Sequence, residues 1–145
     1  MKITDNIEAI LGDCLEVMKD IPDNSVDMIL CDLPYGINTT HSCSWDKMLP
    51  IDKLWEQYNR IIKGNGAICL FGTEPFSSLL RVSNLKMFKY DWIWEKNHAV
   101  GFVNAKRKPM NKHEIVSVFS KGICANTNRK DKDMPYYPQG LKKSG

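Results

Sequence analysis

The segment Asp32-Leu33-Pro34-Tyr35 carries the clearest chemical potential in this chain of 145 residues. A carboxylate and a backbone carbonyl each accept a hydrogen bond from an amino group, and a tyrosine ring stacks on planar rings. Pro34 has a fixed φ and restricts Leu33 before it, so the turn is preset. The segment is therefore suited to hold a planar, amine-bearing ring. The alternative is an ordinary strand-to-loop turn with a surface aspartate and a packing tyrosine.

A second polar turn, Gly12-Asp13-Cys14, lies between two apolar stretches. It follows residues 7–11, a predicted strand, and precedes residues 14–21, whose apolar side chains recur at helical spacing. Asp13 is suited to cap this helix by accepting a hydrogen bond from its first amides. A place at the end of a strand also suits contact with a ligand, and the two roles are compatible.

Predicted strands and helices alternate through residue 85. Strands are predicted at residues 7–11, 26–31, 67–71, 88–94 and 115–119. Helices are predicted at residues 14–21, 51–62 and 75–82, the second opened by Pro50 and stopped by Lys63-Gly64, and residues 36–50 are predicted as a polar loop.

This order predicts an α/β fold with a mostly parallel sheet and helices on its faces. The nearly continuous apolar run at residues 26–31 fits a buried parallel strand. Ligands in such folds bind outside the carboxyl ends of the strands. Both polar turns therefore lie where a ligand is expected.

Charge is unevenly distributed along the chain, whose net charge is +3. Residues 1–85 hold 7 basic and 12 acidic side chains, whereas residues 86–145 hold 13 basic and 5 acidic ones. A basic half favours a polyanionic partner such as DNA or RNA. Lysines that only keep a surface solvated are the alternative.

Composition excludes several classes of protein. No apolar run approaches the roughly 18 residues of a membrane span, and the first residues lack the apolar stretch of a secretory signal. The five cysteines are an odd number without a C-x-x-C pair, so neither a disulfide framework nor a metal site is predicted. These features favour the reducing cytoplasm.

Residues 32–35 resemble the Asp/Asn/Ser-Pro-Pro-Tyr motif of the amino-methyltransferases that act on DNA bases. Further stretches resemble the members of this family whose motifs occur in permuted order. They follow one another in the same order and at the same spacing as in those members, and the resemblance covers most of the chain. The stretches are residues 11–16, 21–27, 54–63, 66–68, 90–96 and 108–114.

The resemblance implies a Rossmann-like methyltransferase domain that uses S-adenosylmethionine and takes its target base out of the DNA duplex. Asp32 and the Leu33 carbonyl, in the turn stiffened by Pro34, would hold the amino group of that base. Tyr35 would stack on it. An aspartate at the first position resembles the adenine-modifying members, which implies methylation of adenine N6. Restriction-modification in a bacterial or phage context is the setting this implies.

The resemblance also implies roles for residues outside the turn. Asp13, the backbone near Cys14, Asp32 and Phe71 would face the cofactor, although core packing is an equal alternative for Phe71. A segment with basic side chains would face DNA, with a solvated loop as the alternative. Its candidate residues are Lys96, Phe102, Asn104, Lys106, Arg107 and Lys108.

Relatives with this motif order continue into a target-recognition region and a strand ending in Phe-x-Gly-x-Gly, which this sequence lacks. We therefore expect an incomplete fold, with residues 1–121 as catalytic core and residues 122–145 as a basic, loop-like tail leading towards the absent region. The chain is then a fragment, is completed by a second chain, or binds DNA without methylating it. Methylation of an RNA or protein amine is a further alternative.

Overall fold

The computed structural model describes residues 2–36, 46–125, 132–140 and 142. The predicted loop at residues 36–50 lies largely outside them. Short elements come first: β1 (Lys2–Thr4), β2 (Ile7–Glu8), α1 (Cys14–Val17) and the 3-10 helix η1 (Met18–Asp20). The others are β3 (Val26–Asp32), α2 (Ile51–Ile61), β4 (Ile62–Gly72), α3 (Phe76–Ser83), β5 (Phe88–Val100), η2 (Phe102–Asn104) and β6 (Asn111–Phe119).

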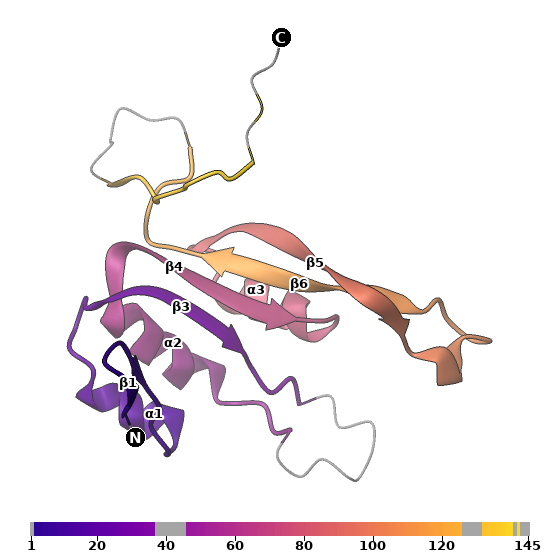
Figure 1. The fold of residues 1–145 in the computed structure, drawn as a ribbon, viewed down its shortest axis with the longest axis horizontal. Helices are drawn as coiled ribbons and strands as arrows, with labels where there is room; N and C mark the ends of the chain where they lie inside the picture. The colour runs from indigo at the N-terminus through magenta and orange to yellow at the C-terminus, as the bar shows by residue number, and fades with distance from the viewer. Residues whose placement is uncertain (1, 37–45, 126–131, 141, 143–145) are drawn as a thin grey trace.

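Four strands form one sheet in the order β3-β4-β6-β5, as Figure 1 shows. β3 and β4 are parallel because α2 connects them as a crossover, whereas β4–β6 and β5–β6 are antiparallel. The prediction of an α/β fold is confirmed. The prediction of a mostly parallel sheet is wrong, because β5 and β6 form a long hairpin that pairs with β4 from the other side.

The predicted strand at residues 7–11 is also wrong in length and place. β2 covers only Ile7–Glu8 and pairs with β1 in a separate two-stranded sheet. Ile10 and Leu11 are exposed, Leu11 by 104% of its reference area. A strand persists only where a neighbour satisfies its backbone, and no described strand pairs with residues 9–11.

α2 and α3 cover one face of the sheet (Figure 1). Their buried side chains pack on those of β4 and β6 in the main core, among them Leu54, Trp55, Phe76, Leu80 and Phe119. The predicted stop at Lys63-Gly64 is wrong. α2 ends at Ile61, and Ile62, fully buried, already has extended backbone and begins β4.

The opposite face of the sheet carries a smaller cluster. Cys69, Val116 and Val118 are buried there, with Met134 of the C-terminal segment packed against them. β3 is an edge strand, because β4 is its only described neighbour. Met28 and Leu30 are on the face of β3 away from the helices and are 49% and 62% exposed, so the prediction of a buried strand holds only for its helix-covered face.

Arg60 ties the entry into β3 to α2. Its guanidinium donates to the carbonyls of Met18 and Ile21 at 2.6 and 2.7 Å, and to Asp23 at 2.6 Å. At the same end of the sheet, buried Ser120 donates to the Gly66 carbonyl at 2.8 Å. These bonds fix the amino ends of β3 and β4. Among the described residues, no helix has the length and apolar character needed to cross a membrane.

Candidate active site

The Asp32–Tyr35 turn lies at the carboxyl end of β3. The Tyr35 hydroxyl donates a hydrogen bond to Asp32 Oδ1 at 2.7 Å. Burial, followed by this bond to the carboxylate, raises the pKa of the Tyr35 phenol above its ordinary value, so the phenol stays protonated. The Tyr35 ring stacks on Phe76, the first residue of α3, with ring centres 5.0 Å apart. Two contacts therefore orient Asp32 and Tyr35.

The backbone of this turn is held on both sides. Leu33 is only 7% exposed and belongs to the main core, so the leucine side chain fixes its own peptide in place. Gly36 has φ +66°, and its amide donates to Asp46 Oδ1 at 2.9 Å. A Cβ at Gly36 would come within 2.9 Å of Met48 Cβ, so the chain returning from the loop closes against the turn.

Phe71, at the end of β4, lies opposite Asp32 in the parallel ladder. Its ring meets Trp94 of β5 edge to face, with centres 6.0 Å apart. Phe71 is a predicted site residue, whereas Trp94 is not among the predicted ones. The alternation of aromatic residues in β5 was visible in the sequence, but the β5–β6 pairing that brings Trp94 to Phe71 was not.

Lys96 and Glu114 form an ion pair next to these aromatic rings. Glu114 lies opposite Trp94 in the β5–β6 ladder, and its charge is among the causes that raise the pKa of Tyr35. The two side chains are 28% and 24% exposed. Lys96 is predicted to contact DNA, but no role is predicted for Glu114, because the ion pair joins residues on two strands.

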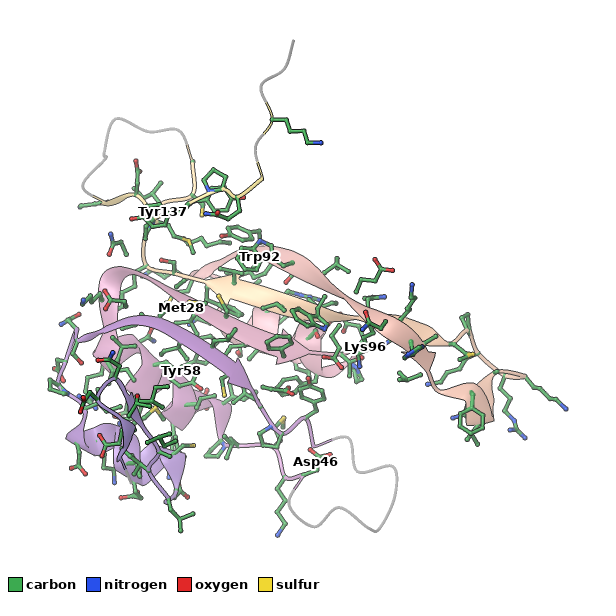
Figure 2. All side chains as sticks on the ribbon, in the orientation of Figure 1. Met28, Asp46, Tyr58, Trp92, Lys96 and Tyr137 are labelled. Atoms are coloured by element: carbon green, nitrogen blue, oxygen red, sulfur yellow. The ribbon has the colours of Figure 1, made fainter. Side chains whose placement is uncertain are left out.

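The other predicted DNA-binding residues lie elsewhere, on an arm formed by residues 101–110. Gly101, with φ +91°, lies between the last residue of β5 and the first residue of η2 and is the N-cap of η2. Figure 1 shows this arm projecting beyond the sheet. Lys96, labelled in Figure 2, lies within the sheet, on strand β5 of the β5–β6 hairpin. The arm carries the exposed residues Phe102, Asn104, Lys106, Arg107 and Lys108. The structure thus separates Lys96 from the rest of the predicted set.

Asp13 is the N-cap of α1, because its Oδ1 accepts a hydrogen bond from the Leu15 amide at 2.8 Å. This prediction is confirmed. Cys14 is exposed beside it. Asp13 lines a hollow of about 410 Å³ between α1 and α2, together with Lys19 and Gln57. Since β2 lies outside the four-stranded sheet, Asp13 does not end a strand of that sheet, contrary to the expectation.

The predicted absence of a metal site is not contradicted in the part of the chain that the structure describes. No group of three or more metal-ligating side chains occurs there. Cys31, interpreted as a core residue, packs partly buried against the main core. Burial raises the pKa of its thiol, so the thiol stays protonated.

No family model matches the chain, but curated proteins are similar to it, among them two type II methyltransferases. The type II methyltransferase M.HinfI of Haemophilus influenzae is 28% identical, over 82% of this chain and 40% of its own. The type II methyltransferase M.HpaI of Haemophilus parainfluenzae is 25% identical, over 77% of this chain and 38% of its own. The chain thus spans about two fifths of the length of these relatives.

Solved structures with the same fold are likewise longer. The PvuII DNA methyltransferase, which is cytosine-N4-specific, aligns with a TM-score of 0.59 and 13% identity, over 77% of this chain and 48% of its own. M1.HpyAVI in complex with SAM aligns with a TM-score of 0.53 and 20% identity, over 76% and 53%. A DNA modification methylase from Thermus thermophilus, complexed with S-adenosyl-L-methionine, aligns at 0.53 with 16% identity, over 83% and 58%.

The resemblance first seen at residues 32–35 is confirmed by these findings. The structural alignments, made at low identity, bear on the fold alone. The chain is a homologue of the type II DNA methyltransferases and has, over part of their length, the α/β fold of the S-adenosylmethionine-dependent DNA methyltransferases.

Proposed function

We propose that this chain is the catalytic portion of a DNA methyltransferase that modifies the exocyclic amino group of adenine. The observation that carries the proposal is the Asp32–Tyr35 pair, hydrogen-bonded at 2.7 Å at the carboxyl end of β3. That is the place where ligands bind in open α/β sheets. An aspartate leading the turn favours adenine, and the cytosine-N4 specificity of a structural neighbour makes cytosine the competing base.

In this proposal the residues of the turn act on the amino group of the base. Tyr35 engages Asp32 Oδ1, which leaves Oδ2 to accept a hydrogen bond from the amino group. The Leu33 carbonyl accepts the second hydrogen. Both contacts raise electron density on the amino nitrogen and favour the positive charge that develops there. Asp32 is also placed to receive the proton that the methylated nitrogen releases.

S-adenosylmethionine supplies the methyl group when it is bound. The described residues offer both polar and apolar contacts that suit parts of S-adenosylmethionine. Asp13 retains an oxygen beyond its bond to Leu15, and the hollow that it lines, about 410 Å³, is of a size that small-molecule sites have. Phe71 and exposed Leu30 offer apolar surface beside Asp32. Asp13, the Cys14 backbone, Asp32 and Phe71 remain the residues that we propose to hold it.

Double-stranded DNA is the proposed substrate, and the arm of residues 101–110 is its proposed contact. Its exposed lysine and arginine side chains suit phosphate groups, and exposed Phe102 suits stacking on a base. In the same proposal, residues 1–121 form the catalytic core.

A second candidate function is DNA binding without methylation. It is favoured by one observation, that Lys106, Arg107 and Lys108 are exposed on an arm that projects beyond the sheet (Figure 1). Under this alternative the basic arm retains its role and the Asp32 turn does not act. Methylation of an RNA or protein amine is a further alternative. It is distinguished from these two candidate functions by comparing DNA, RNA and protein as substrates that receive the methyl group.

The test is transfer of a labelled methyl group from S-adenosylmethionine to mixed-sequence DNA, RNA and protein. We expect label in DNA alone, recovered as N6-methyladenine after digestion. Asp32→Ala should abolish transfer while circular dichroism is unchanged. Asp27→Ala is the matched control, since Asp27 lies on the same strand but pairs with Lys63. A folded chain that binds DNA without transferring label supports the second candidate, and N4-methylcytosine as product overturns the choice of base.

A further inference from the structure

Two Lys–Glu ion pairs join β5 and β6, and they differ in surroundings. Lys112 and Glu95 meet at 2.7 Å with side chains 54% and 73% exposed. Lys96 and Glu114 are 28% and 24% exposed. Glu95 and Lys96 are adjacent in β5, and Lys112 and Glu114 are two residues apart in β6, so the two pairs are neighbours that differ in exposure. Partly withdrawing a pair from water costs desolvation energy, so stability alone is weak grounds for the Lys96–Glu114 pair.

The Lys96–Glu114 pair shares its face with the candidate site. Phe71 lies opposite Asp32, and its ring contacts Trp94, which pairs with Glu114. Glu114 thus lies two strands away from Asp32 and two residues along from its register partner Val116, a backbone separation of about 12 Å. Phe71 is on β4, the strand between them, and a separation of this size has room for a single planar base.

We propose that Lys96, held by Glu114, is a specificity-determining residue that donates a hydrogen bond to the ring nitrogen beside the exocyclic amine of the target base. The proposal rests on the methyltransferase function proposed above. Asp32 then accepts from the amine and Lys96 donates to its neighbour. Adenine and cytosine both present a donor amine beside an acceptor ring nitrogen. Thymine presents the opposite order, an acceptor oxygen beside a donor N–H, and is rejected, as is guanine when it enters with its O6 and N1–H.

The pairing with Glu114 favours a base contact over a phosphate contact. A carboxylate beside the ammonium offsets its attraction for a second anion, but it leaves two of three N–H donors to point elsewhere. By contrast, no ion pair of Lys106, Arg107 or Lys108 is found in the described part of the chain, and all three are exposed. The arm therefore suits phosphates, and Lys96 suits a neutral acceptor.

The experiment compares short single-stranded thymidine oligonucleotides, which require no base flipping, by fluorescence anisotropy. One carries a central deoxyadenosine, one a central 1-deaza-2′-deoxyadenosine, which lacks only the N1 acceptor, and one carries thymidine throughout. The chain should bind the adenine oligonucleotide about tenfold more tightly than the deaza oligonucleotide, as expected for a hydrogen bond to a charged donor. Lys96→Met should bring this ratio close to one, and Glu114→Gln should lower it.

Lys112→Met is the matched control, because it removes a lysine of the same hairpin and should leave the ratio unchanged. Equal weakening of both oligonucleotides by Lys96→Met would mean a phosphate contact and overturn the proposal. A ratio of one in the unaltered chain, with adenine binding still weakened by Asp32→Ala, overturns only the role of Lys96. Adenine bound no better than thymidine, and insensitive to Asp32→Ala, overturns the proposed base site together with it.

Discussion

The two ends of the β3–β4 pair use polar side chains in different ways. At the amino end, Arg60 and Ser120 donate to main-chain carbonyls and so join segments that are distant in sequence. At the carboxyl end, Asp32 and Tyr35 bond to each other. Bonds to the main chain fix the fold. Bonds between side chains leave oxygen and nitrogen atoms that a ligand can use, and the two ends therefore respond differently to mutation.

Asp32→Ala is expected to have the largest effect on activity. Removing an oriented group that stabilises developing charge lowers transfer rates by about 100-fold or more. Asp32 is exposed and outside the core, so the free energy of unfolding in urea should change by less than about 0.5 kcal/mol. A large loss of stability would show that the carboxyl end serves the fold as the amino end does.

Arg60→Met tests the opposite end. It removes donors to the Met18 and Ile21 carbonyls, and a hydrogen bond from a charged donor contributes about 1.5–3 kcal/mol net, less where the side chain is partly exposed, as Arg60 is. We expect unfolding in urea to become easier by about 2–3 kcal/mol. Oligonucleotide binding at low denaturant should be unaffected, and a selective loss of binding would contradict the division between the two ends.

Tyr35→Phe sharpens the account of the site. It keeps the ring that stacks on Phe76 and removes only the hydroxyl that orients Asp32. We expect methyl transfer to fall about tenfold, as for loss of one hydrogen bond to a charged group. The melting temperature should be nearly unchanged. Activity equal to that of the unaltered chain would mean that the hydroxyl does not position the carboxylate.

The two hairpin ion pairs should also differ in stability. Lys112→Met breaks an exposed pair, which is expected to change the free energy of unfolding by less than about 0.5 kcal/mol. Lys96→Met leaves half-buried Glu114 without its partner, and we expect a loss of about 1 kcal/mol. Urea unfolding of the two variants side by side checks this order, and the reverse order would contradict it.

The smallest expected effect is on the pH dependence of stability, and it concerns Glu74. The Ser78 hydroxyl, followed by Arg81, lowers the pKa of the Glu74 carboxyl below its usual value. A lowered pKa in the folded state contributes stability above the ordinary pKa, and that stability is lost as pH falls through the lowered value. Glu74→Gln should therefore be slightly less stable at neutral pH and equal in strong acid. Unfolding curves across this range, at low salt, test it.

Local segments were predictable from the sequence, and their partners were not. The helices after Pro50 and Pro75 follow from apolar residues at helical spacing, and both occur where expected. The N-cap at Asp13 follows from one side chain and the amides two residues on. The length of β2 and the exposed edge of β3 depend on which strands lie alongside, which no local pattern specifies.

The candidate site divides in the same way. The sequence by itself determined the Asp32-Leu33-Pro34-Tyr35 turn, because its geometry is set by neighbouring residues and a proline. Only the tertiary structure decided that Trp94 contacts Phe71, the neighbour of Asp32, and that Glu114, paired with Lys96, lies next to Trp94. Those residues come from three strands, and their meeting depends on strand order and register. Register arises from packing and backbone pairing between distant segments, so it is a property of the folded sheet.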